Sequence, residues 1–252
     1  MKIALLTGAS SGLGASYAKY ISEIFPDIDE IWAAARRADR LTELSENSEG
    51  AKIVPVACDL ASEDGFHKLT EKLNAEKPEI MLLVNNAGLG FHGAFEKSEL
   101  SEQERCIDVN IRALTRLTRV CLDYMPKGAR ILNTSSIASF VPNAYMSVYS
   151  ASKAYVTFFS RALNEELKKS GRSSTAVCPA PMNTEFLKVG RVAGNSKAFE
   201  WLPYCDVDKV AEGALKAAKK RKAVYTPRAF YRFYRILSRI LPDSLLMKMA
   251  KT

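Results

Sequence analysis

Short apolar runs alternate with longer segments of helical periodicity along this chain. The runs at 3–6, 31–35, 53–57, 80–85, 130–134 and 174–178 are mostly apolar, which predicts buried strands. Between them, segments 13–25, 40–46, 63–74, 102–125 and 149–169 predict helices, and two of these end near Pro126 and Gly171. Strands that alternate with helices form a parallel sheet, so the pattern predicts a doubly wound α/β fold.

The same pattern bears on domain organisation. No internal repeat or linker interrupts the chain, so we expect one domain over residues 1–252. Residues 181–202 lack clear periodicity and are expected to form a lid over a cleft. Residues 226–252 are expected to form an amphipathic C-terminal extension.

Composition narrows the class of protein. The 252 residues are 47% hydrophobic and 25% charged, which is enough to bury a core. The five cysteines are odd in number and scattered, and only two histidines accompany them, so we expect reduced thiols and no metal site. No apolar run approaches the about 20 residues that cross a bilayer, which favours a cytoplasmic protein.

The net charge of +8 is confined to the C-terminal part of the chain. Residues 1–205 hold 24 basic and 24 acidic side chains, whereas residues 206–252 hold 12 and 4. A nucleic-acid groove needs basic residues spread over a shaped surface, so this distribution argues against a nucleic-acid partner.

A glycine loop follows the first predicted strand and opens the first helix. Its glycines are Gly8, Gly12 and Gly14, in a strand-turn-helix setting where free backbone amides and the positive helix end can hold a pyrophosphate. At the end of the second strand the chain reads Arg36-Arg37, where a carboxylate would bind the ribose of NAD. A guanidinium pairs instead with a 2′-phosphate, which indicates NADP(H).

Tyr149 and Lys153 lie four residues apart in a predicted helix and therefore share one face. An ammonium group near a phenol favours the phenolate. Moving the tyrosine pKa from about 10 to near 7 needs roughly 4 kcal/mol, which a unit charge at about 4 Å supplies at an effective dielectric of about 20. Ser136 ends the fifth strand, at the edge of the sheet where such folds bind ligands.

These motifs, in this order, resemble the short-chain dehydrogenase/reductase family, whose members have a Rossmann-type fold. The resemblance runs from Thr7 to about Thr184. It is carried by Thr7-Gly8-x-x-x-Gly12-x-Gly14, Asp59-Leu60, Asn85-Asn86-Ala87-Gly88, Asn110, Ser136, Tyr149-x-x-x-Lys153 and the segment from Pro179 to Thr184.

The resemblance implies a catalytic role for four residues. Tyr149 would be the general acid in ketone reduction or the base in alcohol oxidation, and Lys153 would lower its pKa and hold the nicotinamide ribose. Ser136, rather than its neighbour Ser135, would hydrogen-bond the substrate oxygen. Asn110 would hold a water that relays protons to Lys153.

The resemblance also implies a set of cofactor contacts, with Asp59 at the adenine and Thr184 at the nicotinamide carboxamide. Ala180 stands where the family usually has glycine, which makes the backbone of that turn less certain. The expected cofactor-binding residues are Gly8, Ser10, Ser11, Gly12, Leu13, Gly14, Arg36, Arg37, Asp59, Leu60, Asn86, Ala87, Gly88, Tyr149, Lys153, Pro179 and Thr184.

The expected substrate is apolar. In this family the substrate pocket is formed by segments that here read 89–93, 138–146 and 182–202, which are rich in aromatic residues and methionines and carry no basic cluster. A steroid or bile-acid hydroxyl or oxo group fits this best, and a 3-oxoacyl chain is the alternative. A protein of another class, an NADP-sensing binding protein without turnover, stays open.

The C-terminal segment at 228–241 has an arginine face and an apolar face. Such a helix can lie on an anionic membrane, cap the substrate cleft or pack on another subunit. The family resemblance implies a homodimer or homotetramer that forms through the helices near Asn110 and Tyr149. The apolar face consists of Phe230, Phe233, Tyr234, Leu237, Ile240 and Leu241, and the opposite face of Arg228, Arg232, Arg235 and Arg239.

Overall fold

The computed structural model describes residues 1–191 and 202–249 of the chain. Its centre is a parallel sheet of seven strands in the order β3-β2-β1-β4-β5-β6-β7. The strands are β1 (Lys2–Thr7), β2 (Glu30–Ala35), β3 (Lys52–Ala57), β4 (Glu79–Asn85), β5 (Arg130–Thr134), β6 (Ser173–Val177) and β7 (Val224–Tyr225). This order confirms the predicted doubly wound, Rossmann-type fold.

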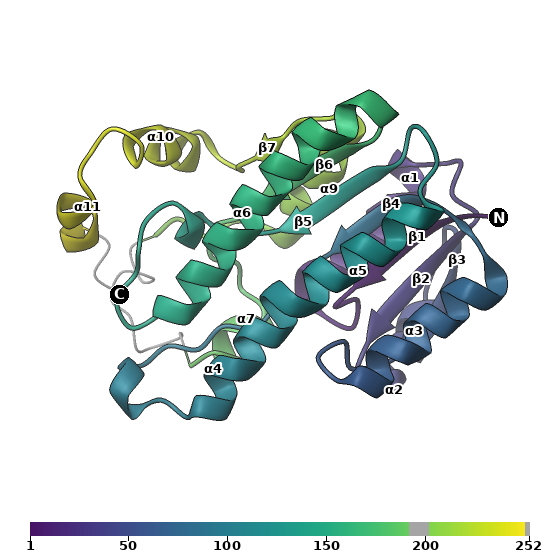
Figure 1. Ribbon diagram of the computed structural model, residues 1–252, viewed down its shortest axis with the longest axis horizontal. Coiled ribbons are helices and arrows are strands. Elements are labelled where there is room, and N and C mark those ends of the chain that lie inside the picture. The colour runs from purple at the N-terminus through teal and green to yellow at the C-terminus, as the bar shows by residue number, and fades with distance from the viewer. Residues whose placement is uncertain (192–201, 250–252) are drawn as a thin grey trace.

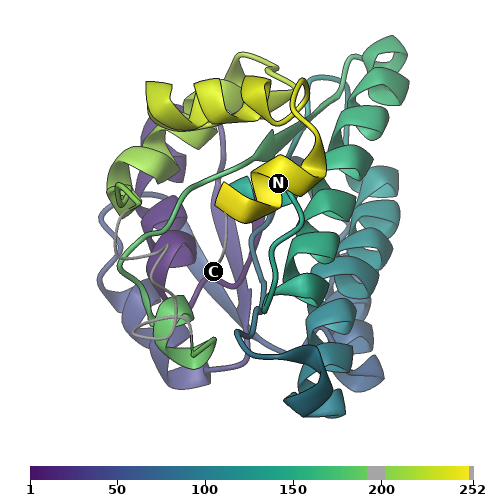
Figure 2. The same cartoon turned by 90° about the vertical axis from the view of Figure 1, so that its left-hand side faces the viewer.

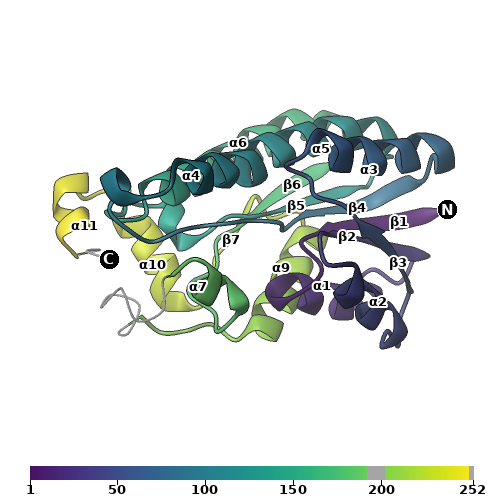
Figure 3. The ribbon, with the colours of Figure 1, turned by 90° about the horizontal axis from the view of Figure 1, so that it is seen from below.

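Helices cover both faces of the sheet (Figures 1 and 3). On one face lie α3 (Glu63–Glu76), α5 (Leu114–Cys121) and α6 (Ser147–Leu167), and on the other α1 (Gly12–Ile24), α2 (Ala38–Glu46) and α9 (Val207–Lys219). The remaining helices are α4 (Leu100–Ile107), α7 (Glu185–Val189), α10 (Ala229–Leu237) and α11 (Asp243–Met249). Short 3-10 turns occur at Phe95–Lys97, Leu122–Tyr124, Ile137–Ser139 and Lys168–Ser170.

The six predicted strands are all present, and the differences lie in the helices and at the C-terminal end. The predicted helix 102–125 starts earlier and is divided, because a π-helical turn at Asp108–Ala113 separates α4 from α5. The pattern also failed to predict α9 and the two-residue strand β7. β7 is too short for a periodic signal. α9 does have helical periodicity, since its buried residues Val210, Ala211, Ala214, Leu215 and Ala218 recur at helical spacing, and the sequence reading overlooked this signal.

The lid and the C-terminal extension are only partly described. Residues 192–201 of the predicted lid lie outside the described residues, and the described part contains α7. The C-terminal extension forms α10 and α11, so its helix ends earlier than the 228–241 pattern suggested. The division into one domain at 1–252 with an extension at 226–252 stays a prediction. Among the described residues, no helix has the length and apolarity that crossing a bilayer requires.

Each face of the sheet has its own hydrophobic core. Ala4, Leu6 and Ile31 point toward α1 and α9, whereas Leu5 and Trp32 point toward α3 and α5. This alternation follows from the strand period of two, and burial on both faces explains why the strands read as continuous apolar runs. The five cysteines are buried free thiols within the protein.

Polar side chains inside the molecule fix β4 and β5 to the helices above them. The Asn85 amide donates to Thr118 on α5 at 2.9 Å and to Asn133 on β5 at 2.8 Å. Asn133 in turn donates to Ser160 on α6 at 2.8 Å. Buried amides need such partners, and this chain of bonds places α6 at a defined height over the ends of the two strands.

The glycine loop contacts the loop after β4 so closely that side chains cannot fit there. A Cβ atom on Gly14 would lie 1.9 Å from the Gly8 carbonyl oxygen and 2.9 Å from the Asn86 amide nitrogen. Thr7 joins the same two loops, since its hydroxyl oxygen accepts hydrogen bonds from the Asn86 and Ala87 backbone amides, both at 3.0 Å. The reversal of strand order between β1 and β4 therefore forms one rigid unit.

We predict that Gly14→Ala destabilises the protein by about 1–3 kcal/mol, because the added methyl group forces the two loops apart. Urea unfolding measures this change. Glu23→Ala, an exposed substitution on the same helix, is the control and should leave the unfolding free energy near the wild-type value. Equal stability of the Gly14→Ala variant and the wild type would contradict the close contact.

Candidate active site

A cleft of about 870 Å³ opens at the carboxyl edge of the sheet, where the order of the strands reverses. The glycine loop and the arginines after β2 line one end of it, and apolar residues of α7 and α10 line the other. Every residue expected from the sequence in catalysis or cofactor binding lies in this cleft except Gly14 and Asn110, which pack directly behind its wall.

Two arginines line the end of the cleft beside the glycine loop. Arg36 is exposed, whereas Arg37 is held: its guanidinium donates to the Ser10 hydroxyl at 3.2 Å and pairs with Glu185 at 2.9 Å. Glu185 is the first residue of α7, and Arg37 lowers the pKa of its carboxyl group. The sequence reasoning did not identify Glu185, because nothing in the chain pattern shows that α7 returns to β2.

Thr184 and the Pro179-Ala180 turn lie against the glycine loop. A Cβ atom on Gly12 would lie 3.2 Å from the Thr184 methyl group, so this threonine packs over the loop. The Pro179 carbonyl accepts a hydrogen bond from the Ile137 amide at 3.0 Å. Ala180 is buried and is not among the residues with a left-handed backbone, so its methyl group fits the turn that the sequence left uncertain.

Asp59 and Leu60 line the same end of the cleft, after β3. The Asp59 carboxylate accepts a hydrogen bond from the Ala61 amide at 3.1 Å and pairs with Arg105 of α4 at 2.5 Å. Burial alone would raise the pKa of this carboxyl group, but these two donors lower the pKa overall. Arg105 therefore holds Asp59 in its ionised form at the cleft wall.

Tyr149 and Ser136 face each other in the middle of the cleft. Tyr149 belongs to α6 and Ser136 follows β5, and each is 9% exposed. The Ser136 oxygen also accepts a hydrogen bond from the Ala138 amide at 3.1 Å, which fixes its direction. Ser135 points away: its hydroxyl donates to the Lys153 carbonyl oxygen inside the protein at 2.8 Å. Of the two serines after β5, Ser136 is therefore the one whose hydroxyl is directed toward Tyr149.

Lys153 lies one helical turn after Tyr149 and is almost completely buried. Its ammonium nitrogen donates to the Thr134 carbonyl at 2.8 Å and lies 5.8 Å from the centre of the Tyr149 ring. Burial lowers the pKa of Lys153 to about 8 and raises the pKa of Tyr149 to about 12. Desolvation is the largest cause of the Tyr149 shift, so in the protein alone the pKa of this phenol lies above its ordinary value and not near neutrality as the sequence predicts.

Asn110 lies in the π-helical turn between α4 and α5. Its side-chain oxygen accepts from the Leu89 amide at 2.8 Å, and its nitrogen donates to the Leu89 carbonyl at 2.7 Å. These paired bonds hold the π-helical turn against the loop that follows β4. A Cβ atom on Gly88 would lie 3.2 Å from the Lys153 nitrogen and 3.4 Å from the Asn110 oxygen, so a glycine there lets these two polar groups approach each other. π-Helical turns often occur at functional sites.

The far end of the cleft is apolar. Met182 and the α7 residues Phe186, Leu187 and Val189 line one side of it, and the Phe186 ring lies 5.6 Å from the Tyr149 ring. Three residues of α10 line the other side: Phe230, Tyr231 and Tyr234. The C-terminal helix therefore forms part of the cleft wall, whereas its other predicted roles, membrane contact and packing on another subunit, stay predictions.

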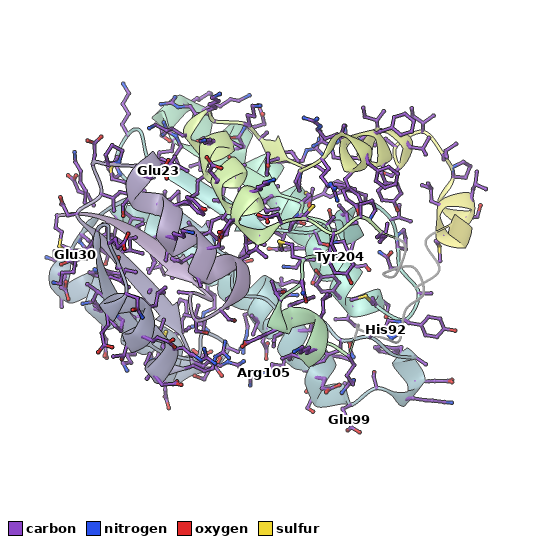
Figure 4. The ribbon with its side chains drawn as sticks, turned by 180° about the vertical axis from the view of Figure 1, so that it is seen from behind. Glu23, Glu30, His92, Glu99, Arg105 and Tyr204 are labelled. Atoms are coloured by element: carbon purple, nitrogen blue, oxygen red, sulfur yellow. The ribbon has the colours of Figure 1, made fainter. Side chains whose placement is uncertain are left out.

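Tyr231 anchors α10 against the body of the protein. It is completely buried, and its hydroxyl donates to the Pro203 carbonyl at 2.8 Å. Two residues of the apolar face predicted from the sequence, Phe233 and Ile240, are more than half exposed. In Figure 4, Tyr204 and His92 lie toward the end of the molecule that carries α10, and Glu23 and Glu30 lie at the other end. His92 is not among the residues that line the cleft.

Comparison with known proteins identifies the family. The model of the short chain dehydrogenase family matches residues 2–192, most of the chain, and the chain belongs to that family. The probable oxidoreductase EphD of Mycobacterium tuberculosis is 30% identical over 264 aligned positions, which cover 95% of this chain and 43% of that protein. The very-long-chain 3-oxoacyl-CoA reductase of Rattus norvegicus is 31% identical over 195 positions, covering 74% of this chain and 61% of the reductase. The chain thus spans about half the length of these relatives.

Two solved structures resemble the whole chain. A short-chain dehydrogenase from Sphingobium yanoikuyae in complex with NADPH has 28% identity and a TM-score of 0.80, with 98% of this chain and 95% of that chain covered. The bulky-bulky ketone specific alcohol dehydrogenase from Comamonas testosteroni has 27% identity and a TM-score of 0.74, with coverages of 98% and 94%.

The depressed pKa of Lys153 predicts a pH-dependent stability. Between pH 8 and 10.5 the unfolded chain holds a proton on this lysine that the folded protein has released, so the contribution of Lys153 to stability should rise with pH over this window. The buried cysteines, whose pKa values are raised, lower stability with pH in both proteins, so the test is the difference between them. Relative to Lys153→Met, which has no such group, the rise should approach about 3 kcal/mol. Urea unfolding at a series of pH values measures both proteins.

The matched control is Lys169→Met, which replaces an exposed lysine just beyond the same helix. The difference between this control and the wild type should stay constant over the window. Parallel pH profiles for the wild type and Lys153→Met would show that Lys153 is solvated and not desolvated.

Proposed function

We propose that this protein is an NADP(H)-dependent oxidoreductase that interconverts an apolar ketone and its secondary alcohol. The observation that carries the proposal is the convergence of Ser136, Tyr149 and Lys153 in one cleft with the glycine loop. These side chains come from β5 and α6, and the loop from β1, so only the folded chain brings them together. Family membership and the ketone-specific solved relative support the same activity.

The cleft residues suit a dinucleotide with a 2′-phosphate. The loop around Gly12 opens α1 with free backbone amides, as a pyrophosphate requires. Arg36 and Arg37 offer two guanidinium groups at the end of β2, and Ser10 holds Arg37 toward the loop. The relative that binds NADPH supports this assignment. We propose that Asp59 and the segment Asn86–Gly88 hold the adenosine part, and Thr184 the nicotinamide end.

When bound, the nicotinamide supplies a hydride to the carbonyl carbon of the substrate and accepts it back in the reverse direction. The protein supplies the proton. With a pKa of about 12, Tyr149 is a phenol at neutral pH, so in ketone reduction it can donate its proton to the oxygen that becomes the alcohol. Ser136 donates a hydrogen bond to the same oxygen, which stabilises the negative charge that develops there.

Lys153 and Asn110 then restore the proton. Lys153 is mostly an ammonium group at neutral pH, because its pKa is about 8, and its charge favours the phenolate that Tyr149 becomes after donation. We propose that Asn110, held by Leu89 on the other side of Gly88, positions a water that passes a proton toward Lys153. In alcohol oxidation the protons move in the opposite direction.

The apolar end of the cleft supports a lipid-like substrate. Its walls are formed by Met182, Phe186 and the aromatic residues of α10, without a basic cluster for a phosphate or carboxylate among the described lining residues. We propose a steroid or bile-acid oxo group as the substrate. A 3-oxoacyl chain is the second candidate, which the resemblance to a very-long-chain 3-oxoacyl-CoA reductase favours.

A binding protein that senses NADP(H) without turnover is the alternative from another class. Such a protein has no need of a general acid, yet Ser136, Tyr149, Lys153 and Asn110 are all in place here. Their burial has a cost in stability that a sensor would gain nothing from. The arrangement therefore favours the enzyme.

We also propose that the protein forms a homodimer or homotetramer through α5 and α6. Phe158 of α6 is 69% exposed, and Tyr155 on the same helix bonds to Thr115 of α5 at 2.8 Å, so the two helices offer one joined surface. A large exposed aromatic ring on a flat helical layer is typical of an interface. The cytoplasmic location expected from the sequence stays a prediction.

Tyr149→Phe should abolish turnover and leave the affinity for NADPH near that of the wild type, because only the proton donor is removed. NADPH oxidation is measured with oxo-steroids, oxo-bile acids, 3-oxoacyl thioesters and small ketones, and NADPH binding by fluorescence. We expect a loss of at least about 100-fold, the usual contribution of a general acid. Full activity of this variant would refute the assignment of Tyr149.

The Arg37–Glu185 pair yields a prediction about cofactor choice. Glu185→Gln removes a carboxylate that occupies Arg37 and would repel a 2′-phosphate, so NADPH should bind about two- to fivefold more tightly. NADH lacks that phosphate and should bind as before. The matched control is Glu165→Gln, an exposed glutamate paired with Lys168 on another face. Equal gains for both cofactors would contradict this arrangement.

A further inference from the structure

The C-terminal helix presents large apolar side chains to solvent on the side away from the cleft. Phe233 and Ile236 of α10 and Ile240 in the turn that follows are 64%, 56% and 73% exposed. Their spacing of three and four residues places them in one stripe on the helix surface. We call these three residues the outer stripe. The buried anchor Tyr231 lies on the opposite side of α10, so the outer stripe takes no part in holding the helix to the body of the protein.

Guanidinium groups flank the outer stripe. Arg232 and Arg239 are exposed and lie seven residues apart, next to the stripe on the helix surface. None of the ion pairs in the described part of the chain involves either of them. The surrounding sequence is equally one-sided, since residues 213–242 contain nine Lys and Arg and no Asp or Glu.

We propose that the outer stripe and its arginines dock on the surface of an anionic phospholipid bilayer. Apolar side chains that insert between lipids and arginines that pair with headgroup phosphates are the two features such a contact needs. A second copy of the chain fits this surface poorly. In a symmetric dimer the same patch meets itself, so the arginines of the two copies would come together, and residues 213–242 contain no Asp or Glu that could pair with them.

The position of α10 gives this docking a consequence for the cleft, which rests on the proposed function. Phe230 lines the cleft and is also 57% exposed, so it marks the mouth. Figure 2 shows that α10 and α11 lie across the end of the molecule that holds the carboxyl ends of the strands. A protein docked through the outer stripe therefore holds the mouth of its cleft near the bilayer. An apolar ketone dissolved in the bilayer then reaches the site without crossing bulk water.

Vesicle flotation tests the proposal with the full chain. Wild-type protein should float with vesicles of phosphatidylcholine and phosphatidylglycerol, stay below with phosphatidylcholine alone, and be released by high salt. Phe233→Gln/Ile236→Gln/Ile240→Gln should no longer float. Arg232→Gln/Arg239→Gln should bind anionic vesicles about 25-fold more weakly, at about fivefold for each arginine.

Two control variants match these changes on other faces of the molecule. Phe95→Gln replaces a phenylalanine that is 62% exposed, and Lys168→Gln/Lys169→Gln removes two exposed cations. Both should float like the wild type. Turnover of a water-soluble ketone without vesicles should be unchanged in all variants, because none of the substituted residues lines the cleft.

The outcomes separate the docking surface from the proposed function. A wild type that reduces ketones but does not float with anionic vesicles overturns the docking surface. So does flotation that survives the outer-stripe substitutions. If these substitutions instead turn an oligomer into a monomer in light scattering without lipid, the surface is a contact between copies and the proposal is wrong. A protein that floats as predicted but reduces no ketone supports the docking surface and contradicts the proposed function.

Discussion

The candidate site depends on burying the ammonium group of Lys153 beside the end of β5. Removing such a group from water is expensive, and the protein meets this cost with the Thr134 carbonyl at 2.8 Å and a position fixed by α6. The same burial lowers the pKa of Lys153 to about 8, which is close enough to neutral pH for the ammonium group to release and take up a proton. The network from Asn85 through Asn133 to Ser160 holds α6 over the strand ends. Because α6 carries Lys153, this buried packing also positions the ammonium group in the cleft.

The remaining parts of the site are positioned by backbone contacts more than by side-chain pairs. Asn110 bonds both backbone groups of Leu89, and Thr7 accepts from the amides of Asn86 and Ala87. Such bonds fix loops after different strands to one another. The close approach of these loops also explains why glycine is required at two positions. A methyl group on Gly14 would overlap the Gly8 carbonyl, and one on Gly90 would lie 2.5 Å from the Tyr149 ring.

The sequence predicted the sheet and the shared helical face of Tyr149 and Lys153, because both follow from local patterns, whereas the roles of the other site residues came from the family resemblance and stay predictions. The strands are continuous apolar runs, and the spacing of Tyr149 and Lys153 places them on one helical face. It could not predict contacts between distant segments. The Glu185–Arg37 pair spans 148 positions, and α10 reaches the cleft only through the course of the chain after β6.

The Tyr149 pKa and the surroundings of α10 could not be predicted from the sequence, for physical reasons. A nearby ammonium group lowers the pKa of a phenol, but burial raises it, and burial is the largest cause of the Tyr149 shift. In α10 the buried anchor is Tyr231, which belongs to neither of the two faces predicted from the sequence. An amphipathic pattern predicts two faces, but it does not tell which surroundings each face meets.

The account as a whole requires that this cleft transfers a hydride. The most direct test is a single turnover with NADPH deuterated at the nicotinamide C4 and an apolar ketone, followed by mass spectrometry of the alcohol. The account predicts deuterium on the carbon that was the carbonyl, and a hydroxyl hydrogen that comes from solvent. NADPH that binds tightly but passes no deuterium to any steroid, bile-acid or 3-oxoacyl ketone would contradict it and favour a binding protein.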